Sequence, residues 1–202
     1  KRNLLNEKIY NTTLLKKMHD MLAHRGKDSF GTILTSSAGL SHARLSIRDI
    51  NGGLQPMKKT KNHNDYYICY NGEIYNTDEL KSDLISKGYI FDTTSDTEII
   101  INCFLEYGPD FVNKLNGIFA FAIWDNYNNR LYLYRDRVGV KPLFYYSKNE
   151  LTIFASEPKA IFCHPSITPE IDLTSLQEII GIGPARTSGC GIFKNIHEII
   201  PG

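Results

Sequence analysis

The sequence has little that would suit a membrane or a nucleic acid. No stretch approaches the roughly 20 consecutive apolar residues that a membrane helix needs. Neither sign of charge is in excess, with 23 Lys and Arg against 22 Asp and Glu, so no basic field would attract phosphates or anionic lipids. The basic start, Lys1-Arg2-Asn3, is not followed by an apolar signal segment. These absences predict a protein of the cytoplasm whose partner is a small molecule.

Cysteine is also scarce. The four cysteines, Cys69, Cys103, Cys163 and Cys190, lie far apart, without a C-x-x-C pair or a nearby histidine at zinc-ligand spacing, so no metal site is predicted. Cys69 and Cys103 fall in apolar runs, where a free thiol normally behaves as a small buried hydrophobe. The chain shows no glycine-rich phosphate loop, internal repeat or low-complexity segment, and nucleotide binding is therefore not expected in it.

The composition is that of one globular domain. Hydrophobic residues make up 42% and aromatic residues 11% of the 202 residues, which is enough for a sizeable core. Apolar spacing and capping residues predict helices near 13–23, 76–87, 95–107 and 173–180, with a further turn from Pro109 to Leu115. Gly26 is expected in the left-handed cap that ends the first of these helices.

The strand signals form hairpins. Two short strands flank Ala38-Gly39, and an aromatic strand over 66–70 runs into Asn71-Gly72, a dipeptide typical of turns. One hairpin is predicted from the runs 118–124 and 130–134, and a second from 143–146 and 151–155. Since the strands cluster as hairpins and the helices lie elsewhere, antiparallel sheets covered by helices are favoured over an alternating parallel fold. The predicted fold class is α+β.

Five short motifs follow one another along the chain. They are His24-Arg25-Gly26-Lys27-Asp28, Arg44-Leu45-Ser46-Ile47, Tyr70-Asn71-Gly72-Glu73-Ile74-Tyr75-Asn76, Ser95-Asp96-Thr97-Glu98 and Tyr134-Arg135-Asp136-Arg137-Val138-Gly139-Val140-Lys141-Pro142-Leu143. In this order and spacing they resemble the glutamine amidotransferase domain of glutamine-hydrolysing asparagine synthetases, a class II amidotransferase with an N-terminal nucleophile. The similarity covers nearly the whole chain, and five motifs in register are far more specific than any one of them.

The resemblance implies an N-terminal-nucleophile fold, an αββα sandwich in which two antiparallel sheets stack face to face with helices outside. Residues 1–202 would form this domain without its first strand and nucleophile. A C-terminal synthetase domain, absent from this chain, would use ATP and Mg²⁺ to make asparagine from aspartate, while the domain in hand would need no cofactor. Glutamine and that synthetase domain are the expected partners, and a homodimer is allowed.

The resemblance also implies a chemistry. In the family, an N-terminal cysteine attacks the side-chain amide of glutamine, its own α-amine serves as the base, and ammonia leaves before water frees glutamate. The developing oxyanion needs fixed hydrogen-bond donors. By resemblance these are the Asn71 side-chain amide and the Gly72 backbone N–H. The parent protein is therefore expected to be a ligase that hydrolyses glutamine and uses the ammonia for asparagine synthesis.

Recognition of free glutamine has its own requirements. The substrate carries an α-carboxylate and an α-ammonium, and both need partners once they leave water. The resemblance assigns Arg44 to the carboxylate, and Asp96 and Glu73 to the ammonium. Leu45 and Ile47 would supply backbone groups and the pocket wall.

Taken singly, several of these residues have structural interpretations. Arg44 suits a surface ion pair, Asp96 a helix N-cap and Asn71-Gly72 a turn. Arg135 and Asp136 are interpreted as a structural ion pair near a hairpin end and not as catalytic groups. Only the joint register of the motifs favours the functional interpretation.

The chain departs from the family at its start, where the family has Met-Cys-Gly and this chain has Lys1-Arg2-Asn3. The chain alone is expected not to hydrolyse glutamine, and a leading segment with the cysteine is expected in the parent. Cys190-Gly191-Ile192-Phe193 imitates the family's opening, but an internal cysteine has no free α-amine, so Cys190 is interpreted as a structural thiol. The alternative is a non-catalytic glutamine-binding or interaction module that keeps the pocket without the nucleophile.

Overall fold

The computed structural model describes residues 4–45, 52–183, 187 and 189–202. Its helices are α1 (Leu4–Leu22), α2 (Thr77–Ser86), α3 (Asp96–Tyr107), α4 (Pro158–Ile161) and α5 (Leu173–Ile182), with 3₁₀ segments η1 (Ala23–Arg25) and η2 (Pro109–Lys114). Its strands are β1 (Ser29–Leu34), β2 (Gly39–Arg44), β3 (Met57–Lys61), β4 (Asn64–Ile74), β5 (Gly117–Asp125), β6 (Arg130–Arg135), β7 (Phe144–Lys148), β8 (Leu151–Ala155) and β9 (Ile196–Glu198). Each helix and hairpin expected from the sequence has a counterpart among them.

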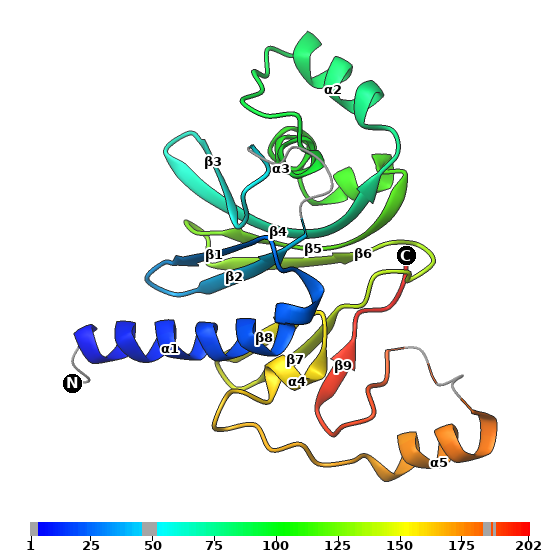
Figure 1. Cartoon of the computed structure of the whole chain (residues 1–202). Coiled ribbons are helices and arrows are strands. Elements are labelled where there is room, and N and C mark those ends of the chain that lie inside the picture. The colour runs from blue at the N-terminus through cyan, green and yellow to red at the C-terminus, as the bar shows by residue number, and fades with distance from the viewer. Residues whose placement is uncertain (1–3, 46–51, 184–186, 188) are drawn as a thin grey trace.

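The elements form a layered sandwich (Figure 1). Helices α2 and α3 cover one face of a four-stranded antiparallel sheet of order β3-β4-β5-β6. The β1–β2 hairpin and a three-stranded sheet of order β8-β7-β9 make up the second sheet layer, with α1 and α4 outside it. The predicted α+β class is confirmed. Within the part of the chain that the structure describes, the second sheet layer consists of two separate sheets.

Three apolar clusters hold these layers together. The largest lies between the four-stranded sheet and helices α2 and α3, and it includes the almost fully buried Ile100, Phe111 and Phe121. A second cluster, around Ile153 and Ile161, packs β7 and β8 against α4 and α1. Burial of each such side chain contributes about 1.5–3 kcal/mol, so the four-stranded sheet with α3 is the firmest part of the molecule. The third cluster joins β2 to the four-stranded sheet through Leu40, Tyr67, Cys69 and Trp124.

Strand β4 runs without interruption through Asn71 and Gly72, so the turn predicted there is wrong. In the β4–β5 register Gly72 lies opposite Phe119. A Cβ atom on Gly72 would lie 2.2 Å from the carbonyl oxygen of Ile118. The glycine is needed because β5 approaches so closely, and the chain turns only after Ile74.

The first helix and the glycine after it also differ from expectation. Helix α1 begins at Leu4 and not near Thr13, because good helix formers such as Glu7 extend it beyond the apolar stripe. Gly26 is extended, with φ −156° and ψ 110°, and is not in the left-handed conformation. A Cβ atom there would lie 2.5 Å from the carbonyl carbon of Ala43. Close approach to β2, and not helix capping, explains this glycine.

The structure gives Arg135 and Asp136 partners other than each other, which corrects the predicted ion pair. Arg135 pairs with Glu198 of β9 at 2.8 Å and donates to three backbone carbonyls near the end of the chain and in the turn after β6. The Asp136 carboxylate accepts four backbone N–H groups. Burial raises the pKa of Asp136, but these donors outweigh burial and lower it. Both residues are structural, as expected, and they fix the 136–141 turn.

The cysteines divide as the apolar runs predicted. Cys69 and Cys103 are buried and free, and burial raises the pKa of each thiol to about 12. Cys190 is exposed and pairs with His197 in an isolated β-bridge. Among the described helices, none is long and apolar enough to cross a bilayer.

Candidate functional site

Strand β4 presents two of the predicted site residues on one face. Because successive side chains of a strand alternate between faces, Asn71 and Glu73 share the face of Cys69. This face packs against β2, where the sulfur of Cys69 lies 3.9 Å from the carbonyl oxygen of Ser41. Asn71 is half-buried and Glu73 is exposed, so the two polar side chains lie where this packed region opens to solvent.

The backbone of β4 carries a row of N–H donors along one edge. The N–H of Tyr70 donates to the Gln55 side chain at 2.6 Å, and the N–H of Ile74 donates to Asp96 at 3.0 Å. In an antiparallel strand, alternate residues direct their N–H groups to the same edge. The N–H of Gly72, midway between these two, therefore points away from β5 and toward the side on which Gln55 and Asp96 lie.

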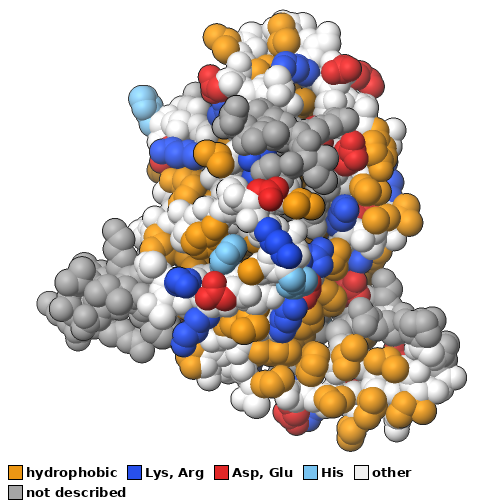
Figure 2. Space-filling model, viewed as in Figure 1, with side chains coloured by type: hydrophobic (Ala, Val, Ile, Leu, Met, Phe, Trp, Pro, Cys, Tyr) orange, Lys and Arg blue, Asp and Glu red, His pale blue; other side chains and the backbone are white. Residues whose placement is uncertain are grey.

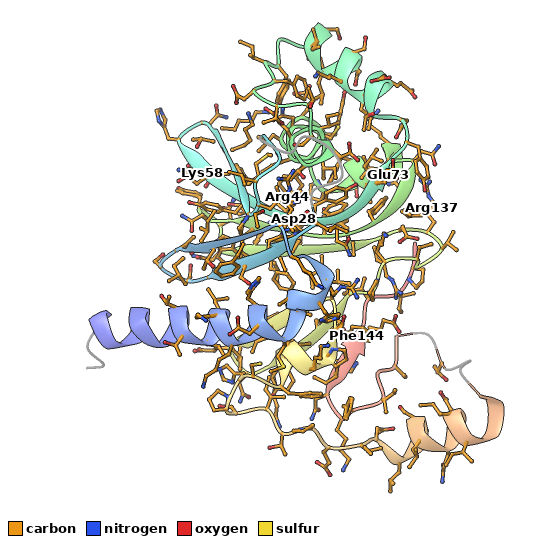
Figure 3. All side chains as sticks on the ribbon, viewed as in Figure 1. Asp28, Arg44, Lys58, Glu73, Arg137 and Phe144 are labelled. Atoms are coloured by element: carbon orange, nitrogen blue, oxygen red, sulfur yellow. The ribbon has the colours of Figure 1, made fainter. Side chains whose placement is uncertain are left out.

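Arg44 ends β2 and is buried, with 6% of its surface exposed. The N–H of Asp28 donates to the Arg44 carbonyl at 3.0 Å and fastens this end of the strand. Figure 3 shows Arg44 beside Asp28, close to the four-stranded sheet, and Glu73 on strand β4. Leu45 follows at the surface and is 58% exposed. Ile47, which the resemblance assigned to the pocket wall, lies outside the described residues.

Asp96 lies in the first turn of α3 and is buried. Ser95 is the N-cap, since its hydroxyl accepts the N–H of Glu98 at 3.4 Å. Oδ2 of Asp96 accepts the N–H of Ile74 at 3.0 Å and the hydroxyl of Tyr70 at 3.3 Å. The positive end of the helix stabilises a carboxylate at this position, and these bonds direct it toward β4.

These residues line one cavity of about 1020 Å³. Its lining includes residues of strands β2, β4, β5 and β8 and of the start of α3. A buried cation and a buried anion at one cavity suit a small molecule that carries both charges. No cluster of three metal-ligating side chains occurs among the described residues. The predicted site residues that line the cavity are Arg44, Leu45, Asn71, Gly72, Glu73 and Asp96.

Gln55 and His42 are among the cavity residues that sequence analysis did not single out. Gln55 brackets Tyr70, because it accepts the Tyr70 N–H and donates to the Tyr70 carbonyl at 3.0 Å. Nε2 of His42 donates to the same carbonyl at 3.0 Å. Burial lowers the pKa of His42 to about 4, with a smaller contribution from Arg44, although the bond to Tyr70 opposes the fall. The i, i+2 spacing of His42 and Arg44 on a strand could have revealed His42, whereas Gln55 lies outside any periodic pattern.

Glu157 links the segment after α1 to the segment after β8. Its carboxylate accepts hydrogen bonds from His24 at 2.8 Å and Arg25 at 2.9 Å, and it pairs with Lys159 at 2.9 Å. Burial raises the pKa of Glu157, but the three donors outweigh this effect and lower it to about 2. The first of the five motifs therefore takes part in an ion-pair network that joins two segments, and each segment contributes a residue to the cavity lining, Arg25 and Ser156.

Comparison with known proteins assigns this chain to a family. The family model described as "Glutamine amidotransferase domain" matches residues 3–202. This chain belongs to the glutamine amidotransferase domain family. The amidotransferase domain resembles "Asparagine synthetase [glutamine-hydrolyzing] 3" of Bacillus subtilis (strain 168), with 45% identity over 201 residues that cover 100% of this chain and 32% of the relative. "Asparagine synthetase [glutamine-hydrolyzing] 1" of the same organism is 41% identical over 165 residues, which cover 82% of this chain and 26% of the relative.

The amidotransferase domain thus spans about a third or less of the length of these two relatives. Among solved structures, it is similar to glutamine phosphoribosylpyrophosphate (PRPP) amidotransferase from B. subtilis complexed with ADP and GMP, with a TM-score of 0.54 and 24% identity. That match covers 62% of this chain and 29% of the other. At this identity the likeness shows the fold alone, and the N-terminal-nucleophile fold expected from the resemblance is confirmed.

Proposed function

We propose that the amidotransferase domain hydrolyses glutamine to glutamate and supplies ammonia for ATP-dependent synthesis of asparagine from aspartate in the whole protein. The observation that carries the proposal is the meeting of Arg44, Asp96 and the Asn71-Gly72 segment at one cavity. The names of the curated relatives, which are glutamine-hydrolysing asparagine synthetases, support it. The whole protein would then be a ligase, and this domain its glutaminase.

In this proposal, residues of opposite charge bind the two ends of glutamine. Arg44 would hold the α-carboxylate with its planar guanidinium, and Asp96 with Glu73 would face the α-ammonium. Leu45 and Ile47 would border the bound substrate. A neutral amide without these ends would leave Arg44 and Asp96 without substrate partners, and breaking buried charge pairs costs about 3–5 kcal/mol each. Selectivity for free glutamine follows from this cost.

The oxyanion of the tetrahedral intermediate would be stabilised by the Asn71 side-chain amide and the Gly72 N–H. The direction of the Gly72 N–H, away from β5, supports this role. The close contact of Gly72 with Ile118 and Phe119 keeps the donor fixed before the reaction starts, and such preorganisation is what makes an oxyanion donor effective. Loss of one donor of this kind costs about 100- to 1,000-fold in rate.

The nucleophile would reach this site from a segment between β2 and β8. In the described sheets each of these strands has a neighbour on one side only, and both strands line the cavity. Free strand edges of this kind favour pairing with a further strand. Nδ1 of His42, on β2, is buried with no hydrogen-bond partner among the described residues. An extended segment that begins with a free cysteine would fill the space between β2 and β8 and join the two sheets.

The remaining part of the protein would hold the synthetase, with its ATP and Mg²⁺, and would dock on an apolar surface. Figure 2 shows hydrophobic side chains gathered over the lower part of the molecule, around α5. Large exposed apolar patches commonly mark interaction sites. The homodimer and the cytoplasmic location stay predictions. The exposed apolar side chains on and near α5, and near the end of the chain, are Ile171 (47%), Leu173 (70%), Ile180 (77%) and Ile200 (60%).

The direct test is glutamate release from the 202-residue chain and from a longer chain that starts with the free cysteine. Only the longer chain should release glutamate. In it, Arg44→Ala should weaken glutamine binding by more than about 100-fold, because the substrate carboxylate loses its cation. Arg130→Ala is the matched control, since Arg130 is exposed and does not line the cavity.

The results of these assays distinguish a glutaminase from a glutamine-binding module. An unchanged KM in Arg44→Ala would overturn the assignment of the substrate carboxylate. No glutamate from either chain, with glutamine still bound, would overturn the enzyme proposal and leave a glutamine-binding module. Hydrogen exchange tests the space between β2 and β8 independently: amides of β2 and β8 should be better protected in the longer chain, and equal protection would argue against an inserted strand.

The docking surface is tested by separating two activities of the whole protein. Ile180→Asp should impair asparagine synthesis from glutamine, while synthesis from added ammonia and glutamate release persist, because only the contact between domains is weakened. Ile90→Asp is the control, since Ile90 is 83% exposed but lies between α2 and α3. If both substitutions leave glutamine-dependent synthesis intact, the synthetase does not dock on α5.

A further inference from the structure

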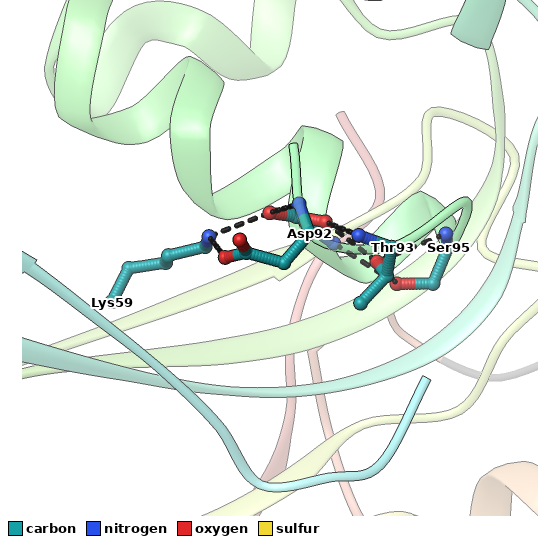
Figure 4. Close-up of polar contacts among 5 residues, drawn as sticks. Lys59, Asp92, Thr93 and Ser95 are labelled. Carbon is teal, nitrogen blue, oxygen red and sulfur yellow. Dashed lines mark hydrogen bonds and ion pairs between the residues drawn. The ribbon is translucent and has the colours of Figure 1, made fainter. Parts of the chain in front are cut away.

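The loop that leads into α3 is organised by one buried carboxylate. Glu98 has no exposed surface, and its carboxylate accepts the N–H of Asp92 at 2.9 Å, the N–H of Thr93 at 2.7 Å and the Thr93 hydroxyl at 2.6 Å (Figure 4). Burial raises the pKa of Glu98, but Lys59 and these donors outweigh burial and lower it, so the group is ionised at neutral pH.

Strand β3 supplies the counter-charge from the neighbouring sheet. Nζ of Lys59 lies 2.5 Å from Oε1 of Glu98 and 2.7 Å from Oδ2 of Asp92. The Lys59 side chain is 20% exposed and that of Asp92 is 77% exposed, so the inner pair is shielded from water and the outer pair is not. Shielded pairs are weakly screened by salt, and they hold their geometry better than surface pairs.

This arrangement goes beyond an ordinary helix cap. Ser95-x-x-Glu98 has the spacing of a capping box, in which the glutamate would bind the N–H of the N-cap residue. Here the N–H of Ser95 instead donates to the Thr93 hydroxyl at 3.2 Å, and Glu98 reaches back to residues 92 and 93. The carboxylate therefore fixes the whole turn before α3, not only the first helical turn.

Asp96 follows directly after this turn. It lies between the cap Ser95 and the anchor Glu98, and its carboxylate is already bonded to Ile74 and Tyr70 on β4. A shift of the turn would move this carboxylate relative to the cavity. We propose that Lys59 and Glu98 are positioning residues that hold Asp96 at the place where the α-ammonium of glutamine binds. The inference rests on the glutaminase function proposed above.

The test uses the active, longer protein and two substrates. One is glutamine and the other is 4-carbamoylbutanoate, which is glutamine without its α-ammonium. Glu98→Gln and Lys59→Met should each lower the selectivity for glutamine, measured as the ratio of the two kcat/KM values, by about tenfold or more. The loss should fall on the KM for glutamine, because the oxyanion donors are untouched. Lys59→Arg keeps the charge and should retain most of the selectivity.

Lys58→Met is the matched control, because Lys58 neighbours Lys59 on β3 but pairs with Asp65 at the surface, at 2.8 Å. It should leave the ratio unchanged. Equal losses for both substrates in Glu98→Gln and Lys59→Met would show general loosening and overturn the positioning role. If Glu98→Gln does not fold, as judged by circular dichroism, the Lys59→Met and Lys59→Arg pair decides. A wild-type protein that binds neither substrate would instead overturn the proposed function itself.

Discussion

Replacing Glu157 by glutamine should show how much the ion pairs of its carboxylate contribute to the free energy of unfolding. The substitution keeps the shape of the side chain and removes its charge, which three donors share. A fall of the pKa from 4.5 to about 2 corresponds to about 3 kcal/mol of stability at neutral pH. Because His24 and Lys159 are partly exposed, solvent screening reduces the expected loss to about 2–3 kcal/mol.

The same pKa fixes the pH window. The folded-state pKa lies below the unfolded value, so this stability is fully present above about pH 4.5 and is lost as the pH falls toward 2. Denaturant unfolding of the wild-type chain and of Glu157→Gln should therefore differ by about 2–3 kcal/mol at pH 7 and by only about 1 kcal/mol at pH 3. Glu150→Gln, in the exposed β7–β8 turn, should change neither value. If the difference in the free energy of unfolding between the wild type and Glu157→Gln is the same at pH 3 as at pH 7, the reasoning is refuted.

Two further predictions concern the four-stranded sheet and the thiols. Gly72→Ala should destabilise the fold by about 3 kcal/mol or more, because the added methyl meets the β5 backbone; Gly181→Ala, in open space on α5, should be neutral or stabilising by up to about 1 kcal/mol. Equal melting temperatures for the two variants would contradict the close approach. Iodoacetamide should label Cys190 in the folded chain and leave the buried Cys69 unmodified, as mass spectrometry can show, and rapid labelling of Cys69 would mean that β4 opens readily.

The helices and hairpins could be predicted well from the sequence, because local signals determine them. Capping residues and apolar spacing predicted a helix over 95–107, and the β-rich runs 118–124 and 130–134 predicted the β5–β6 hairpin, both of which the structure confirms. The errors arose where the reason for a residue lies in a distant strand. Gly72 and Gly26 were interpreted through local turn and cap preferences, yet each is required by the backbone of another strand. Strand β9, of three residues, is too short to leave a periodic pattern.

The site could be predicted by motif but not by geometry. The resemblance gave the residues, and the structure adds that Arg44, Gly72 and Asp96 share one cavity. The roles of these residues stay predictions. Gln55 could not be predicted from the sequence, because its contribution is a pair of hydrogen bonds to the backbone of Tyr70, a residue of another segment.

The two residues proposed to bind the ends of the substrate, Asp96 and Arg44, lie in parts of the molecule that differ in rigidity. Asp96 is bonded to β4, which lies between β3 and β5 and carries the largest core cluster on one face. Arg44 ends β2, which in the described sheets has a neighbour only in β1 and lines the cavity together with β8. The ammonium end should therefore be ready in the 202-residue chain, whereas the carboxylate end should become firm only when a strand fills the space between β2 and β8. In the proposed function, arrival of the nucleophile and fixing of the carboxylate would then be one event, because the same inserted strand would bring the cysteine and complete the sheet that holds Arg44.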